Sequence, residues 1–180
     1  MSGGPLEGVR VVDLTSVVVG PLATQILADH GAEIIKVESM AGDLVRQLNG
    51  KSVTPGMGAK FLHLNRNKRS VALDLKHADG MEALRRLIAK ADVMVWNVRP
   101  AAMARLGLSY DDVKKINPKI IYCGLYGFGQ DGRYKDKPAY DTIIQGASGM
   151  AALHHRSTGE PRYVPMVVAD KVVGMTAVQM

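Results

Sequence analysis

The fold of this chain is decided by residues 9–37, VRVVDLTSVVVGPLATQILADHGAEIIKV. Residues 9–14 form a short β-branched, apolar run, which predicts a strand. Residues 22–30 carry a helical pattern that Gly31 ends, because glycine is common just after the last residue of a helix. Residues 33–37 predict a second strand. A strand, a helix and a strand in this order predict a parallel pair joined by a right-handed crossover.

The alternation of strands and helices continues along the chain. Further strands are predicted at 70–73, 92–96 and 119–122, and helices at 79–90, 110–116 and 139–153, with Asp170 opening a last helical pattern. Ser109 is the expected N-cap of the helix at 110–116. Loops or turns are expected at 39–60, 124–132 and 154–161, and extended chain at 163–168. We therefore predict an α/β fold with a mainly parallel sheet.

Composition indicates a soluble globular protein. A length of 180 residues fits one domain with a real core, and 47% hydrophobic with 22% charged residues excludes wholesale disorder. The single cysteine, Cys123, cannot form an internal disulfide, which favours a reducing cytoplasm. Residues 1–10 lack the apolar segment of a signal peptide. No apolar run approaches the roughly 20 residues that a membrane-spanning helix needs.

The formal net charge of +6 indicates an anionic partner. The sequence has no zinc-finger spacing and no basic heptad region, and it has only two Phe and one Trp with which to stack bases. A small polyphosphorylated ligand is therefore a more economical expectation than nucleic acid or a membrane surface.

Three short motifs are open to two interpretations. Residues 65–69, NRNKR, place three cations before a strand, which is more often a solvated turn than a grip on phosphates. Gly127-Phe-Gly129 follows a strand but has neither phosphate-loop spacing. His154 and His155 have no Cys or acidic cluster nearby, so we expect loop residues and no metal site.

The aspartates also have two interpretations. Asp170 is either a helix N-cap or a nucleophile, and the residues alone give Asp13, Asp43 and Asp141 the same choice. A carboxylate has an ordinary pKa near 3.9, so it is ionised at neutral pH and needs no base to attack. Spacing does not choose among the four.

A series of collinear motifs covers nearly the whole chain and resembles the class III CoA-transferases, the CaiB/BaiF family of the formyl-CoA and carnitine-CoA transferase type. The motifs are GPLATQILADHG at 20–31 with IKVE at 35–38, GDLVR at 42–46, LNRNKRS at 64–70 with LD at 73–74, NVRP at 97–100, RLG at 105–107, NP at 117–118, GFGQDG at 127–132, and PAYD at 138–141 with Gln145. Ala101 and Arg133 depart from the family pattern, where Gly and Pro are usual.

The resemblance implies a site. Asp170 matches the family's aspartate that attacks an acyl-CoA thioester. The positions that would hold coenzyme A are Val17, Lys36, Asn67, Lys68, Leu73, Asn97, Val98, Arg105 and Tyr140. Coenzyme A is then a substrate, with no permanently bound cofactor, and part of Gly127–Gly132 is expected to stabilise oxyanions.

The resemblance also implies an architecture. Residues 1–180 correspond to the N-terminal part of a large, Rossmann-like CoA-binding domain, and family chains are about twice as long, with a further small domain and an interlocked homodimer. The segment ending at Met180 has no helix stop signal, so we expect an incomplete unit. Apolar surface is then expected at Val167, Val168, Val172, Val173, Met175 and Val178.

The implied activity is transfer of CoA from an acyl-CoA to a carboxylic acid through an aspartyl intermediate. A racemase of the same family is less favoured, because Tyr140 stands where that branch has its His, and Tyr is a poor base at neutral pH. A non-catalytic CoA-binding module is the alternative from another class. A dinucleotide-binding oxidoreductase is disfavoured by the missing phosphate fingerprint.

Overall fold

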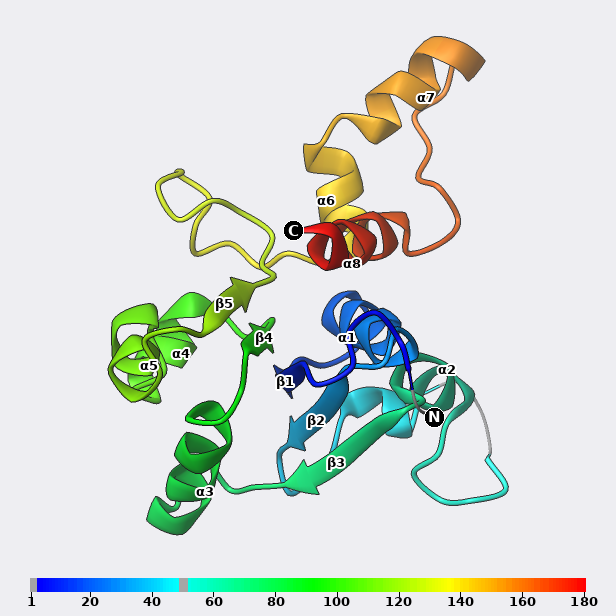
Figure 1. Cartoon of the computed structure of the whole chain (residues 1–180). Helices are drawn as coiled ribbons and strands as arrows, with labels where there is room; N and C mark the ends of the chain where they lie inside the picture. The colour runs from blue at the N-terminus through cyan, green and yellow to red at the C-terminus, as the bar shows by residue number, and fades with distance from the viewer. Residues whose placement is uncertain (1–2, 49–51) are drawn as a thin grey trace.

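In the part of the chain that the structure describes, five strands form one parallel sheet at the centre of the molecule (Figure 1). The computed structural model describes residues 3–48 and 52–180. The strands are β1 Arg10–Leu14, β2 Glu33–Glu38, β3 Lys68–Ala72, β4 Val93–Trp96 and β5 Ile121–Gly124. Their order in the sheet is β3-β2-β1-β4-β5, and every neighbouring pair is parallel. The prediction of an α/β fold with a parallel sheet is confirmed.

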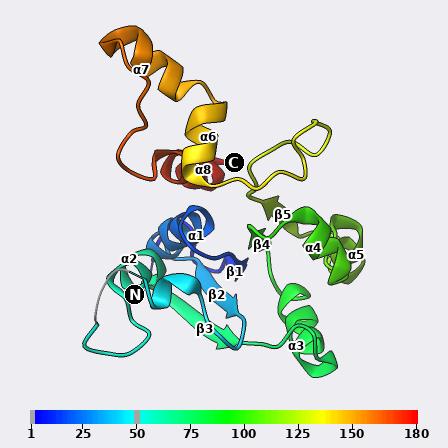
Figure 2. The same ribbon diagram turned by 180° about the vertical axis from the view of Figure 1, so that it is seen from behind.

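Helices cover both faces of the sheet (Figures 1 and 2). On one face lie α1 and α8, and on the other α3, α4 and α5. The helices are α1 Val19–Asp29, a 3-10 turn η1 Leu44–Arg46, α2 Ala59–Asn65, α3 Ala78–Ile88, α4 Pro100–Arg105, α5 Tyr110–Ile116, α6 Asp141–Ala147, α7 Met150–Thr158 and α8 Val168–Gln179. None of the helices in the described ranges is long and apolar enough to cross a membrane.

The core consists of two apolar clusters, one on each face of the sheet. Side chains alternate along a strand, so Val12 faces α3, α4 and α5 while its neighbour Val11 faces α1. Leu84 and Ile88 of α3 are fully buried in the first cluster. Burying a side chain of this size contributes about 1.5–3 kcal/mol. Strands buried on both faces are typical of a parallel sheet.

Two glycines with positive φ mark helix boundaries, one after α1 and one between α6 and α7. Gly31 has φ +101, so the predicted stop after α1 is confirmed. Gly149 has φ +84 and divides the predicted helix at 139–153 into α6 and α7. Because α7 continues to Thr158, the turn predicted at 154–161 is wrong, and His154 and His155 are helical.

Other boundaries also differ from the predictions. Two short helices, α2 and α4, were not predicted, and α2 begins within the expected loop at 39–60. The missed helix α2 is held by burial of Phe61 and Leu64, which its length and pattern do not reveal. A proline at the first position starts α4. The last strand lies two residues later than predicted, and α1 starts at Val19 because its first turn accommodates Pro21.

Helix α8 exposes part of its apolar side. Val172, Val173 and Met175 are exposed, as expected from the sequence, whereas Val167, Val168 and Val178 are half-buried. The helix packs on α1, where a Cβ on Gly174 would come within 2.6 Å of the Val19 carbonyl oxygen. Helix α7 projects away from the sheet in both views and has no buried residue (Figures 1 and 2).

Candidate functional site

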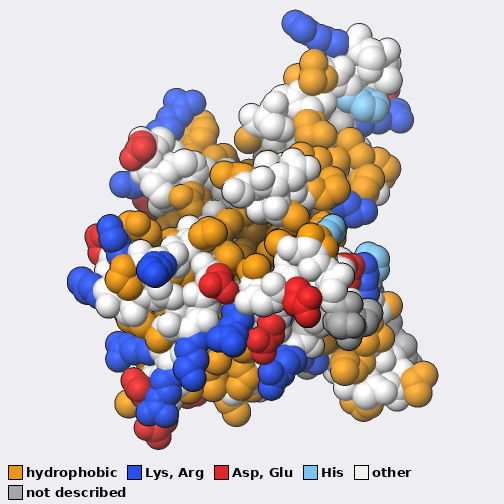
Figure 3. Space-filling view, viewed as in Figure 1, with side chains coloured by type: hydrophobic (Ala, Val, Ile, Leu, Met, Phe, Trp, Pro, Cys, Tyr) orange, Lys and Arg blue, Asp and Glu red, His pale blue; other side chains and the backbone are white. Residues whose placement is uncertain are grey.

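The sheet has a topological switch point between β1 and β4. From β1 the strand order runs outward to β2 and β3, and from β4 it runs the other way to β5. In open parallel sheets, ligands bind outside the carboxyl ends of the strands at such a point. A cleft of about 530 Å³ lies here, and Figure 3 shows a hollow rimmed by hydrophobic side chains.

Segments from distant parts of the chain line the cleft. Residues 16–19, 97–100 and 125–128 follow β1, β4 and β5, and residues 135–141 lead into α6. The first turn of α8 adds Ala169 and Asp170. Six of the residues expected at the site share this cleft: Val17, Asn97, Val98, Arg105, Tyr140 and Asp170.

Asn97 joins the loops after β1 and β4. Its side-chain oxygen accepts a hydrogen bond from the Ser16 N–H at 2.9 Å, and its Nδ2 donates to the Ser16 carbonyl at 2.8 Å. Both backbone polar groups of Ser16 are therefore held by one side chain. The two loops that follow the switch-point strands are fixed to each other at the wall of the cleft.

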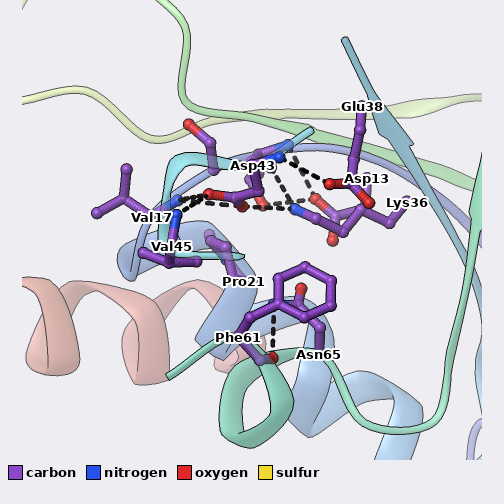
Figure 4. A network of polar contacts seen from close by, with 12 residues as sticks. Asp13, Val17, Pro21, Lys36, Glu38, Asp43, Val45, Phe61 and Asn65 are labelled. Carbon is purple, nitrogen blue, oxygen red and sulfur yellow. Dashed lines mark hydrogen bonds and ion pairs between the residues drawn. The ribbon is translucent and has the colours of Figure 1, made fainter. Parts of the chain in front are cut away.

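Lys36 lies beneath this wall rather than in it. Its side chain is 1% exposed, and Nζ donates to the Thr15 carbonyl at 2.7 Å and to Asp43 Oδ2 at 3.0 Å (Figure 4). The Asp43 carboxylate in turn accepts the Val17 N–H. Lys36 and Asp43 thus hold the loop after β1 on the side that faces away from the cleft. A contact between Lys36 and CoA stays a prediction.

Lys68 is also buried. Its side chain is 1% exposed, and Nζ donates to Asp13 Oδ2 at 3.1 Å, to Thr24 Oγ1 at 2.7 Å, to Asn65 Oδ1 at 2.9 Å and to the Pro21 carbonyl at 3.0 Å. The expectation of a solvated turn is therefore wrong for Lys68. A direct contact of this ammonium with a phosphate would have to replace bonds that it already makes.

Both ionisable groups of the Asp13–Lys68 pair have shifted pKa values. Burial lowers the pKa of Lys68 to about 8, against the attraction of Asp13. Burial opposes ionisation of Asp13 as well, but the charges of Lys68 and Lys36, with hydrogen bonds from Thr15 and Thr24, outweigh it and hold the pKa of Asp13 below its ordinary value. The pair anchors β1 and the start of α1 to β3.

A third buried carboxylate, Glu38, fixes the turn that carries Asp43. Glu38 accepts two hydrogen bonds from the Arg46 guanidinium, at 2.7 and 2.6 Å, and one from the Asp43 N–H at 2.8 Å. Burial raises the pKa of Glu38, but the hydrogen bonds from Arg46, Ser70 and Asp43 dominate and lower it to about 2.

This shift predicts an acid-dependent contribution to stability. The folded pKa of Glu38 is about 2 and its ordinary value is 4.5, so its stabilisation is complete above pH 4.5 and is lost as the pH falls toward 2. We expect the difference in unfolding free energy between the unchanged chain and Glu38→Gln, measured with urea, to shrink over this window. Glu82→Gln, at an exposed pair with Arg86, is the control. A difference that stays constant from pH 6 to pH 3 would contradict the assignment.

Among the described residues, four cations line the cleft. Arg99 immediately precedes α4, Arg105 ends that helix, and Lys135 and Lys137 lie in the loop before α6. None of the four forms an ion pair within the part of the chain that the structure describes. Only Arg105 was expected at the site. The other three stand in loops, where no periodicity marks them.

Asp170 is the third residue of α8, not its N-cap, because the helix begins at Val168. Its backbone N–H donates to Asp141 Oδ1 at 3.0 Å, so the two aspartates lie side by side at the cleft. Burial and, second, the Asp141 charge raise the pKa of the Asp170 carboxyl. A partly desolvated carboxylate at the first turn of a helix is suited to nucleophilic attack.

Gln145 secures the segment before α8. Its side chain is fully buried, and Nε2 donates to Asp141 Oδ2 at 2.6 Å and to the Met166 carbonyl at 3.1 Å. Its Oε1 accepts the Val164 N–H at 2.8 Å. No role is predicted for Gln145 beyond its place in the family motif, because contacts with residues about 20 positions away leave no linear pattern.

Asn67 and Leu73, like Lys36 and Lys68, lie outside the cleft. Asn67 has φ +61 in the exposed turn before β3, and its Nδ2 donates to Asp29 Oδ1 at 2.7 Å. Leu73 lines a separate groove of about 580 Å³ between β3 and α3. Of the glycine-rich segment expected to bind oxyanions, Gly127 lines the cleft. CoA contacts of Asn67 and Leu73, and oxyanion stabilisation by Gly127, stay predictions.

Comparison with known proteins identifies relatives for nearly the whole chain. A family model described as CoA-transferase family III matches residues 6–180. A succinate–glutarate CoA-transferase of Agrobacterium fabrum is 39% identical over 97% of this chain and 45% of its own length. A formyl-CoA:oxalate CoA-transferase of Streptomyces avermitilis is 40% identical over 96% of this chain and 42% of its own length.

A solved structure agrees with these matches. The crystal structure of a CaiB/BaiF family protein from Brucella suis has a TM-score of 0.92 and 37% identity, covering 99% of this chain and 48% of that one. The chain therefore spans less than half the length of these relatives. The family model covers nearly all of the chain, and the fold and sequence relatives agree with it, so this chain belongs to CoA-transferase family III.

Proposed function

We propose that the cleft at the switch point binds an acyl-CoA and that Asp170, in the full-length protein, transfers CoA from one carboxylic acid to another. Asp170 would be bonded first to the acyl group and then to CoA. The observation that carries this proposal is the position of the Asp170 carboxylate, half-buried in the same cleft as four cations. Anionic phosphates require cations, and a thioester exchange requires a nucleophile within reach of the same ligand.

The cleft has a cationic part and an apolar part. Arg99 and Arg105 suit the phosphates of coenzyme A, because guanidinium groups bind phosphate oxygens through paired hydrogen bonds. The apolar residues Leu125, Phe128 and Val173 would contact the uncharged pantetheine arm. This arrangement supports a CoA that enters across α4 with its thioester at α8.

The proposed reaction is a double displacement on Asp170. An Asp170 oxygen attacks the thioester carbonyl, giving an aspartyl–acyl anhydride and CoA thiolate. The thiolate attacks the aspartyl carbonyl, which releases the first acid and leaves an aspartyl-CoA thioester. The acceptor carboxylate attacks that thioester to form a second anhydride and thiolate, and the thiolate takes the new acyl group and frees Asp170. The thioester energy is conserved throughout.

Dicarboxylic acids are the proposed acyl groups. Succinate, glutarate and oxalate, which appear in the names of the two relatives, each carry a second carboxylate. Lys135 and Lys137 line the cleft on the segment that leads to Asp141. In this proposal their ammonium groups pair with the second carboxylate of the acyl group. Transfer from succinyl-CoA to a matched panel of mono- and dicarboxylic acids tests this class. Equal rates with monocarboxylates of the same length would contradict it.

A cytoplasmic homodimer is the proposed state of the full-length protein. The lone Cys123 fits a reducing compartment, and the exposed apolar side of α8 supports association with further protein surface. Sedimentation of the full-length protein measures the assembly. A monomer at micromolar concentration would contradict the proposed dimer.

Replacing Arg105 tests CoA binding directly. We expect Arg105→Ala in the full-length protein to weaken CoA binding by about 1–3 kcal/mol, because a charge-assisted hydrogen bond to phosphate is lost. The loss should shrink as salt is added, since ions screen an exposed charge. Isothermal titration calorimetry with CoA at low and high salt measures both effects.

The matched control is Arg85→Ala. Arg85 is an exposed arginine on α3 that does not line the cleft, so its replacement removes the same charge without touching the site. Equal losses for the two variants would show that only the net charge matters, and the cleft would then not be the phosphate site.

A further inference from the structure

We propose that Asp43, together with Lys36, is a positioning residue for CoA: the buried pair holds Val17 in a left-handed backbone conformation and thereby shapes the wall of the cleft. The inference rests on the proposed function of the cleft as the CoA site. Asp43 itself does not line the cleft, so any effect it has on the ligand must pass through the loop.

The first observation is the backbone of Val17. Its φ is +70, and for a β-branched residue this conformation is a genuine outlier. Val17 is 37% exposed and lines the cleft, so burial of this residue does not impose its backbone conformation. Strain of this kind persists only where the surroundings over-determine it, and it gathers at functional sites.

The second observation is that Asp43 and Lys36 hold the backbone around Val17. The Val17 N–H lies 3.2 and 3.3 Å from the two oxygens of the Asp43 carboxylate (Figure 4). Lys36 Nζ lies 3.0 Å from Asp43 Oδ2 and also donates to the Thr15 carbonyl, two residues before Val17. Both side chains of this pair are 1% exposed. The loop is thus held at two points by one buried ion pair.

Asp43 is itself fixed from the sheet. Its N–H donates to Glu38 Oε2 at 2.8 Å, and its Oδ1 accepts the Val45 N–H at 3.1 Å. Glu38 ends β2 and Lys36 lies on the same strand. The Asp43 carboxylate is therefore held in place by residues of the sheet rather than by a loop. The Val17 N–H donates to this carboxylate, so the cleft wall at Val17 is fixed relative to the sheet.

The positive φ has a structural consequence. The chain leaves β1 at Leu14, turns at Val17 and enters α1 at Val19, and residues 16–19 all line the cleft. If the clamp were lost, Val17 would relax toward negative φ and carry Ser16 and Val18 with it. CoA binding would then fall although no contact residue had been replaced.

Asp43→Asn in the full-length protein is the test. The asparagine has the same shape, but both carboxylate oxygens face donors, so its amide NH₂ would oppose Lys36, Val17 or Val45. We expect CoA binding, measured by calorimetry, to weaken at least about tenfold. In a chain that also carries Val17→Gly, the same replacement should cost less than about threefold, since glycine adopts a positive φ without strain.

Two outcomes would overturn the inference. One is unchanged CoA binding in Asp43→Asn while the unchanged protein binds CoA. The other is an equal loss with valine and with glycine at position 17, which would indicate a general structural effect. Absence of binding in the unchanged protein would instead contradict the proposed function, so the two failures are distinguishable.

A second variant covers the case in which Asp43→Asn does not fold. Lys36→Met with Asp43→Leu removes both charges and leaves no unpaired buried ion, a replacement that folded proteins often tolerate. It still leaves the Val17 N–H without its acceptor. We expect the same loss of CoA binding and the same rescue by Val17→Gly, and a doubly substituted protein that binds CoA normally would overturn the inference.

Discussion

Asp170→Asn in the full-length protein is expected to lower the rate of CoA exchange by about 10³-fold or more, while CoA binding stays within about threefold. The asparagine side chain keeps the shape of the aspartate but has no charge and cannot form an anhydride. Its backbone N–H still donates to Asp141, so the start of α8 is preserved. Exchange is measured by transfer of labelled succinate into succinyl-CoA, and binding by calorimetry.

Chemical trapping identifies the residue that forms the intermediate. Hydroxylamine added during turnover should convert an aspartyl thioester or anhydride at Asp170 into a hydroxamate, which peptide mass spectrometry locates. Asp136 also lines the cleft, so Asp136→Asn is the matched control and should leave both exchange and trapping in place. Substantial exchange in Asp170→Asn, or a hydroxamate on another residue, would exclude Asp170 as the nucleophile.

The regular parts of this fold were predictable because their patterns are local. The strands β1, β2 and β4 and the helices α1, α3 and α5 each carry apolar periodicity or a capping residue within one short window. Ser109, whose Oγ accepts the Asp112 N–H at 3.3 Å, is such a local signal. The helices α2 and α4 are short and depend on burial of Phe61 and Met103, which is decided by distant packing.

The site was predictable only in part for the same reason. The resemblance named six residues that the fold does bring to one cleft, although they span positions 17–170. It could not show that Lys36 and Lys68 lie beneath the cleft, because their partners Asp43 and Asp13 are set by the sheet. In Asn65–Arg69, the side chains of Arg66 and Arg69 are 48% and 79% exposed, whereas that of Lys68, between them, is 1% exposed.

That contrast leads to a large expected effect on stability. Lys68→Met should lower the free energy of unfolding by about 3–5 kcal/mol, because it leaves the fully buried Asp13 carboxylate without its closest cation. Asp13 would keep hydrogen bonds from Thr15 and Thr24, which cannot replace a charge. Urea unfolding of the chain, followed by circular dichroism, measures the change.

The neighbouring residue supplies the control. Arg69→Met removes a cation from the same run and the same strand, but its pair with Glu33 is at the surface, so we expect a loss of about 1 kcal/mol or less. Adding Asp13→Leu to Lys68→Met should recover part of the loss, since no unpaired charge then remains. Equal small losses for Lys68→Met and Arg69→Met would mean that Lys68 is solvated. The phosphate contact expected from the sequence would then again be open to its side chain.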